Sequence, residues 1–105
     1  MSSETERPKP AYLISSLRVL QPEKLEPFRQ SAAPLTAKAG AEPLAFGRAL
    51  VLEGKWNHEG SSLVIERYPS MEALMALWNS PEFQAARRLC EGLVDVDFVI
   101  AMEGR

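Results

Sequence analysis

The order of apolar patterns along the chain constrains its fold more than any other feature. Four segments alternate apolar and polar residues with the period of two typical of β-strands, namely residues 12–20, 44–53, 61–68 and 96–102. In two intervals, apolar residues recur every three or four positions, as in amphipathic helices, namely residues 22–39 and 70–93. The predicted order is strand, helix, strand, strand, helix, strand. This βαββαβ order is the plan of ferredoxin-like α+β folds, in which both helices cover one face of an antiparallel four-stranded sheet.

Proline, glycine and capping residues predict where these elements break. Pro34 removes an internal hydrogen bond, so we expect it to kink or split the first helix. In the second helical interval, Asn79 can end one helix, Ser80 can cap the next and Pro81 can begin it. Gly47 indicates a β-bulge in the second strand.

The composition is that of one small globular domain. The chain has 105 residues, with twelve basic and fourteen acidic side chains, and a formal net charge of -2. It has no run of Lys or Arg, which argues against nucleic acid and membrane surfaces as partners. Residues 1–10 are polar and rich in proline, so we expect a disordered N-terminal arm and a single domain over residues 11–105. The arm has no apolar segment typical of a secretory signal, which favours a cytoplasmic location.

Few residues are available for metal or redox chemistry. The one cysteine, Cys90, and the one histidine, His58, lie 32 positions apart and provide too few ligands for a structural zinc site. The sequence also has no phosphate-binding glycine loop, nucleophile elbow, metal-binding helix motif or pair of redox cysteines. We therefore expect no metal and no cofactor.

Both faces of the predicted sheet carry apolar residues. We expect the helices to cover the face that bears Leu13, Leu17, Leu63, Ile65 and Phe98. The other face would then carry a mixture of residues: Tyr12, Ile14, Ser16, Arg18, Val64, Glu66, Tyr68, Val99 and Ala101. That mixture is too apolar to remain in water, so a partner on this face is expected.

Five short segments of the sequence resemble those of a known family: YLI at 12–14, Pro22, LEGKW at 52–56, VIERYPS at 64–70 and LWNSPEFQ at 77–84. From Tyr12 to Gly104 the chain resembles the bacterial family called domain of unknown function 1330, in the dimeric α/β-barrel superfamily. The resemblance implies a homodimer in which two open sheet faces close a barrel with a cavity in each half. The superfamily includes cofactor-free monooxygenases, muconolactone isomerases and haem enzymes, so the fold alone does not select a reaction. A position that is usually arginine in the family is Cys90 here.

Three groups of residues are candidates for a site. Trp78 and Asn79 lie at the predicted helix break. Either Trp78 is a core residue and Asn79 a helix cap, or both side chains point to the mouth of the barrel. Glu66 and Arg18 are expected to pair across the sheet, either as a structural ion pair or with Glu66 as a general acid or base. His58 lies in the loop between the second and third strands. It is either a solvated side chain or a residue that takes part in proton transfer.

The leading functional hypothesis is a cytoplasmic homodimer whose barrel cavities bind a small, partly aromatic or carboxylated molecule. Proton transfer or cofactor-free oxygenation would then use Glu66, Asn79 and His58 as catalytic residues. The expected ligand-binding residues are Tyr12, Arg18, Tyr68, Trp78 and Arg87. The alternative is a non-catalytic dimerisation or regulatory module with no ligand. A pocket lined by Arg18, Glu66 and Tyr68 would favour the first hypothesis, and a barrel filled by side chains would favour the second.

Overall fold

A computed structural model describes residues 8–58 and 60–105 of the chain. The strands are β1 (Ala11–Val19), β2 (Glu42–Arg48), β3 (Ser62–Tyr68) and β4 (Val94–Glu103). The helices are the short 3₁₀ helix η2 (Pro22–Lys24), α1 (Glu26–Lys38), α2 (Met71–Trp78) and α3 (Pro81–Arg88). Residues 1–7 of the expected N-terminal arm lie outside the described residues.

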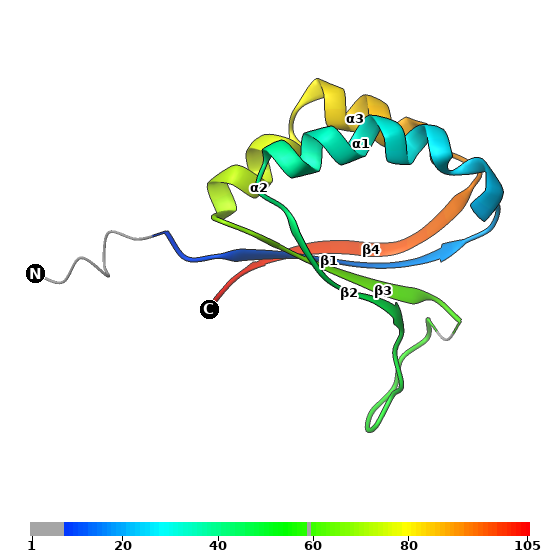
Figure 1. Ribbon diagram of the computed structural model, residues 1–105. Helices are drawn as coiled ribbons and strands as arrows, with labels where there is room; N and C mark the ends of the chain where they lie inside the picture. Colours follow the sequence, from blue (N-terminus) through cyan, green and yellow to red (C-terminus); the bar gives the residue numbers. More distant parts are fainter. Residues whose placement is uncertain (1–7, 59) are drawn as a thin grey trace, which may run out of the picture.

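The four strands form one antiparallel sheet in the order β2-β3-β1-β4. The helices lie together on one face of this sheet, and the other face is open (Figure 1). The predicted ferredoxin-like α+β fold is therefore confirmed.

Local side-chain chemistry explains the helix boundaries. The Ser70 hydroxyl accepts a hydrogen bond from the Ala73 amide at 3.0 Å, which caps α2. The Ser80 hydroxyl caps α3 in the same way, accepting from the Phe83 amide at 3.2 Å, so the predicted break is confirmed. The prediction that Pro34 splits the first helix is wrong, because α1 continues through it. The Pro34 ring is exposed, so the carbonyl it leaves without an internal donor faces water.

The second strand is shorter than predicted. It ends at Arg48, and the chain then forms a long β2–β3 loop (residues 49–61) that leaves the sheet on the side away from the helices (Figure 1). Leu50 and Leu52 in this loop are 82% and 88% exposed. The register of β2 shifts between Pro43 and Ala45 and not at Gly47, because proline has no amide hydrogen to donate to the ladder.

The core lies between the sheet and the helices. Leu13 and Tyr68 from the sheet are buried with Leu74 of α2 and Phe83 of α3. Phe28 and Leu35 of α1 pack against this cluster from above. These contacts identify the helix-facing side of β1 and β3.

The strand registers reverse the predicted faces of β3 and β4. Leu13 pairs with Glu66 and with Ala101, and directly paired residues point to the same side of a sheet. The helix-facing side therefore includes Val64, Glu66, Tyr68, Val99 and Ala101, which were expected on the open face. The open face carries Ile14, as predicted, but with Leu63, Ile65, Phe98, Ile100 and Met102 from the neighbouring strands. Alternation reveals that a strand has two faces, but only the register reveals which of them meets the helices.

A bulge in β4 divides its alternation into two parts. Ser16 pairs with Phe98 but Leu17 pairs with Val96, so Asp97 is the extra residue. Val96 consequently lies on the helix-facing side and Phe98 on the open side, although their spacing predicts a common face. The bulge also leaves the Asp97 side chain next to Ser16 on the open face.

Candidate functional site

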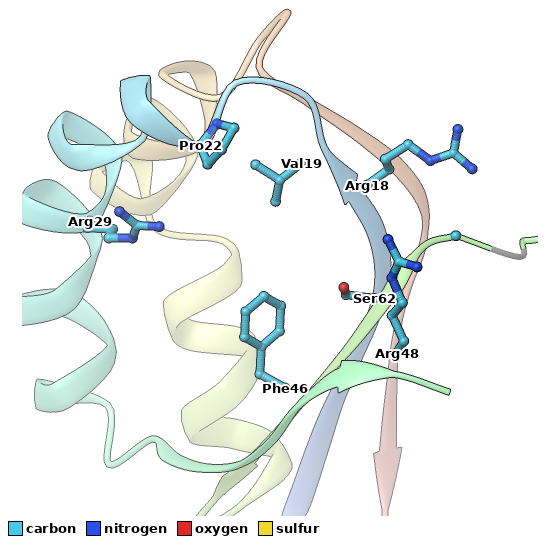
Figure 2. A pocket seen from close by; sticks show the side chains of 8 residues that line it. Arg18, Val19, Pro22, Arg29, Phe46, Arg48 and Ser62 are labelled. Atoms are coloured by element: carbon cyan, nitrogen blue, oxygen red, sulfur yellow. The ribbon is translucent and has the colours of Figure 1, made fainter. Parts of the chain in front are cut away.

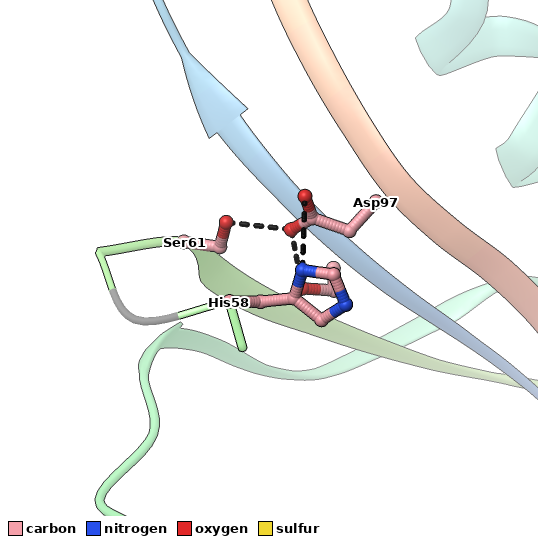
Figure 3. A network of polar contacts seen from close by, with 4 residues as sticks. His58, Ser61 and Asp97 are labelled. Atoms are coloured by element: carbon pink, nitrogen blue, oxygen red, sulfur yellow. Dashed lines mark hydrogen bonds and ion pairs between the residues drawn. The ribbon is translucent and has the colours of Figure 1, made fainter. Parts of the chain in front are cut away.

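A polar cluster on the open face contains the single histidine of the chain (Figure 3). His58 Nδ1 lies 3.3 Å from Asp97 Oδ1. Asp97 Oδ2 accepts hydrogen bonds from Ser61 Oγ at 2.6 Å and from Ser16 Oγ at 2.9 Å. Both serines are buried, whereas the imidazole is partly exposed. The β2–β3 loop, β1 and β4 thus meet at one carboxylate.

The hydrogen bonds keep this carboxylate ionised. The hydroxyls of Ser61 and Ser16 hold the pKa of Asp97 below its usual range, and the charges of His58 and Arg18 act in the same direction. An ionised carboxylate can only accept hydrogen bonds, so Nδ1 of His58 carries the hydrogen that faces it. In the neutral imidazole, Nε2 is then unprotonated and can accept a proton. The pair has the arrangement of a general base that becomes a general acid after protonation.

This cluster does not form a nucleophilic triad. Both serine hydroxyls donate to Asp97, and neither donates to the imidazole. In a serine nucleophile the hydroxyl gives its proton to histidine, while the carboxylate binds the far side of the ring. The geometry therefore supports proton transfer at His58 rather than covalent catalysis by serine.

Aromatic and apolar side chains surround the imidazole. The Trp56 and Phe98 rings approach it edge-on, with centroids 6.2 Å and 6.0 Å from its own. A hollow of about 380 Å³ opens beside it, with a size within the range of small-molecule sites. Its lining residues are Arg48, Ala49, Leu50, Val51, Trp56, His58, Gly60 and Ser61.

Glu66 and Tyr68 form a second pair on the opposite side of the sheet. The Tyr68 hydroxyl donates to Glu66 Oε1 at 3.1 Å, and the tyrosine is fully buried in the core. Burial, followed by the charge and hydrogen bond of Glu66, raises the pKa of Tyr68. The predicted cross-strand pair of Glu66 with Arg18 is wrong. Glu66 pairs with Leu13, and Ser62 with Leu17, so the two charges lie at different ends of the sheet.

Trp78, Arg87 and Asn79 lie above the sheet with the helices. The Arg87 guanidinium lies 4.4 Å from the centroid of the Trp78 ring and donates to Gln84 Oε1 at 3.2 Å. Trp78 packs against the core, whereas Asn79 is exposed as the C-terminal cap of α2. Burial raises the pKa of the Cys90 thiol, and the Arg87 charge partly opposes this effect.

Tyr12 and Arg18 occupy opposite ends of β1. The Tyr12 hydroxyl donates to the Arg105 carbonyl at 2.6 Å, which ties β1 to the C-terminal residue. The Arg18 guanidinium lies against the Gly60 backbone, close enough that a Cβ there would be 3.1 Å from Nη2. Of the seven other predicted site residues, only Arg18 therefore lies near His58.

Sequence reasoning missed Asp97, Ser16 and Ser61 as members of the cluster. Asp97 and His58 are far apart in the chain, and each lies in a segment with no recognisable motif. The available signal was the pair of acidic residues, Asp95 and Asp97, at the start of a strand that is otherwise apolar up to Met102. Among residues 8–58 and 60–105, no group of three or more His, Cys, Asp or Glu side chains is placed to hold a metal ion.

A family model described as Domain of unknown function (DUF1330) matches residues 10–104. The chain belongs to the DUF1330 family. The resemblance seen in the sequence motifs is thereby confirmed. No curated protein matches the chain. None of the helices in the described part of the chain is long and apolar enough to cross a membrane.

Solved structures of similar fold support the ferredoxin-like architecture. A protein of unknown function from Rhodopseudomonas palustris is 16% identical, with a TM-score of 0.73 over 100% of this chain and 95% of the other. SnoaB, a cofactor-independent oxygenase from Streptomyces nogalater, is 15% identical, with a TM-score of 0.60 over 92% and 94% of the two chains. A dimeric protein of ferredoxin-like fold from Bacteroides fragilis is 14% identical, with a TM-score of 0.55 over 90% and 96%. At these identities the likeness establishes the fold alone.

Proposed function

We propose that the chain forms a homodimer through its open sheet face and binds a small molecule beside His58, where the imidazole moves a proton without a cofactor. The pairing of His58 Nδ1 with the ionised Asp97, next to a hollow of small-molecule size, carries the proposal. In this reaction Nε2 accepts a proton from the bound molecule, and Asp97 stabilises the imidazolium that results. Loss of a proton to such a base is also the step that would prepare an electron-rich substrate for cofactor-free oxygenation.

Exposed apolar side chains support the homodimer. Ile100 and Met102 on the open face are 50% and 53% exposed, and Leu50 and Leu52 of the β2–β3 loop are more exposed still. A folded chain rarely leaves such a patch in water. The similar structure from Bacteroides fragilis is described as dimeric, and SnoaB is described as a cofactor-independent oxygenase.

The oligomeric state can be tested by placing a charge on the open face. We expect Ile100→Lys to convert a dimer into a monomer in light scattering, because each subunit would bury an unpaired charge in the proposed interface. Met75→Lys is the matched control, since Met75 is also an exposed apolar residue but lies on α2. A wild-type monomer at micromolar concentration would refute the proposed assembly.

The site can be tested through its single histidine. In ¹⁵N NMR spectra of neutral His58, we expect Nδ1 to carry the proton and Nε2 to be unprotonated. Asp97→Asn should change this tautomer balance, whereas Lys38→Gln on the far side of α1 should not. The opposite tautomer in the wild-type protein would refute the proposed proton path.

Native mass spectrometry tests ligand binding directly. We expect freshly purified wild-type protein to retain a small molecule that Trp56→Ala loses, because Trp56 lines the hollow beside His58. The alternative, a non-catalytic dimerisation module, would be favoured if neither the wild-type dimer nor the Trp56→Ala dimer carries added mass. A hollow filled by side chains of the partner subunit would favour the same alternative.

A further inference from the structure

Two leucines of the β2–β3 loop are the most exposed large apolar residues that the structure describes. Leu50 and Leu52 are 82% and 88% exposed, so little of the described chain covers them. The loop leaves the sheet on the side away from the helices, where the open face lies (Figure 1). Single exposed leucines are common, but two in one loop beside an apolar sheet face indicate contact with another molecule.

The base of this loop is fixed to the sheet on its open side. His58 lies 3.3 Å from Asp97 of β4. Figure 2 shows the Arg18 side chain extending away from the helices, whereas Phe46 points towards them. The Arg18 guanidinium therefore lies against the Gly60 backbone on the open side. These contacts hold the loop where it leaves the sheet, so that it projects beyond the open face instead of folding back over it.

The hollow beside His58 is formed by one short segment. All of its described lining residues lie between positions 48 and 61, in the loop and at the end of β2. Small-molecule sites bury about 70–90% of the ligand surface, which requires walls on several sides. The His58 ring also lies beside Phe98 of the open face, with 6.0 Å between the ring centroids. A second copy that covers the open face therefore also covers the hollow.

The open face alone is smaller than a standard interface. Four strands of seven to ten residues have a footprint of about 500 Å², at about 3.3 Å per residue and about 4.8 Å between strands. Each partner of a standard protein–protein interface contributes about 800 Å² of surface. The remaining area has to come from side chains that project beyond the sheet on its open side, as Leu50 and Leu52 do.

We propose that Leu50 and Leu52 of each β2–β3 loop pack against the second copy of the chain, which closes the open side of the hollow beside His58. A two-fold axis makes this contact reciprocal, so each subunit contributes one loop and receives one. The contact rests on the proposed homodimer, and it makes the site complete only in the dimer. Ligand binding and dimerisation then strengthen one another.

NMR of mixed dimers, made from full-length chains with ¹³C-labelled leucine methyl groups and unlabelled chains, tests the contact directly. We expect isotope-filtered NOEs from Leu50 and Leu52 to the other subunit. Leu89 is the matched control and should give none, because it is also exposed but lies at the end of α3, on the helix side. The proposal is overturned if neither loop leucine shows an NOE to the other subunit, including the case in which both contact their own sheet.

Analytical ultracentrifugation of Leu52→Ser measures how much the contact contributes to the dimer. Burial of one leucine strengthens association about tenfold or more, and the dimer contains the contact twice. We therefore expect the dissociation constant of the dimer to rise about a hundredfold in Leu52→Ser and to stay unchanged in Leu89→Ser. An unchanged constant in Leu52→Ser overturns the proposal. If Ile100→Lys still dissociates that dimer, the proposed homodimer stands and only the loop contact fails.

Closure of the hollow can be followed through the single histidine of the chain. Diethyl pyrocarbonate modifies neutral imidazole, so its rate of reaction reports how accessible His58 is. At fixed pH, we expect the wild-type dimer to react at least about threefold more slowly than the monomer obtained by dilution, because a small-molecule site buries about 70–90% of its occupant. Equal rates in the two forms would show that the partner leaves the hollow open and would overturn the proposal.

Discussion

Replacing Tyr68 by phenylalanine tests whether this residue belongs to the core or to a ligand site. The variant removes one hydroxyl from a fully buried side chain and breaks its 3.1 Å hydrogen bond to Glu66. A hydrogen bond to a charged partner contributes about 1.5–3 kcal/mol. Glu66 is half-buried and can recover part of this energy by binding water, so we expect a loss of about 1–2 kcal/mol.

That loss is large enough to measure in thermal or urea unfolding. For a domain of about 100 residues, the entropy of unfolding is about 0.2 kcal/mol/K, so the midpoint temperature should fall by about 5–10 °C. The comparison requires one fixed protein concentration, because a dimer becomes more stable as its concentration rises. Tyr12→Phe is the matched control, since its hydroxyl is exposed and donates to a backbone carbonyl, that of Arg105. We expect that variant to stay within about 0.5 kcal/mol of wild type.

Alkaline pH provides a second measurement on the same variant. The pKa of Tyr68 is raised in the folded chain, so the folded state holds the phenol proton more tightly than the unfolded state does. The resulting stabilisation is complete below the unfolded pKa of about 10 and declines as the pH rises above it. Tyr68→Phe should lack this decline. Equal stabilities of Tyr68→Phe and Tyr12→Phe at neutral pH, with parallel alkaline profiles, would refute the reasoning.

Three further predictions concern caps, backbone and charge. Ser70→Ala should destabilise the protein by about 1 kcal/mol in urea unfolding, because it removes the cap of α2; an unchanged midpoint would contradict the cap. Gly40→Ala should destabilise the protein by more than the about 1–2 kcal/mol that a left-handed backbone conformation costs an L residue, since Gly40 has a φ of 85° and a Cβ would also lie 2.7 Å from Pro69 Cγ. Stability at or above wild type would contradict that contact. Asp97→Asn should flatten the acid side of the stability profile. The lowered pKa of Asp97 means that its contribution is present above the ordinary carboxyl pKa and is lost as the pH falls, so an unchanged acid profile would argue against the network.

Local chemistry made the helices and their boundaries predictable from the sequence. Ser70 and Ser80 are good caps wherever they precede an amphipathic segment, and each forms the expected hydrogen bond. The order of strands and helices likewise follows from periodicity, which depends only on neighbours in the chain. These features need no information about distant contacts.

The faces of the sheet and the composition of the site were not predictable in this way. Val64 and Leu63 are equally suited to a core, and only pairing of β3 with β1 decides that Val64 faces the helices. The bulge at Asp97 arises from the register between β1 and β4, so it has no local signature. His58 was identified as a candidate, but its carboxylate partner depends on that bulge and was missed.

The position of β4 at the side of the sheet has a consequence for the newly made chain. β4 pairs with β1 on one side only, so its outer backbone groups have no strand partner within the described chain. Residues 98–102 of this edge strand, FVIAM, are uncharged and rich in β-forming side chains, which is the composition that promotes strand-to-strand aggregation. Asp95 and Asp97 precede this segment, and the bulge interrupts the flat edge where it begins. We therefore expect the carboxylate that pairs with His58 to act also as a gatekeeper against aggregation, so replacing Asp97 with an apolar residue should reduce the soluble yield of the protein.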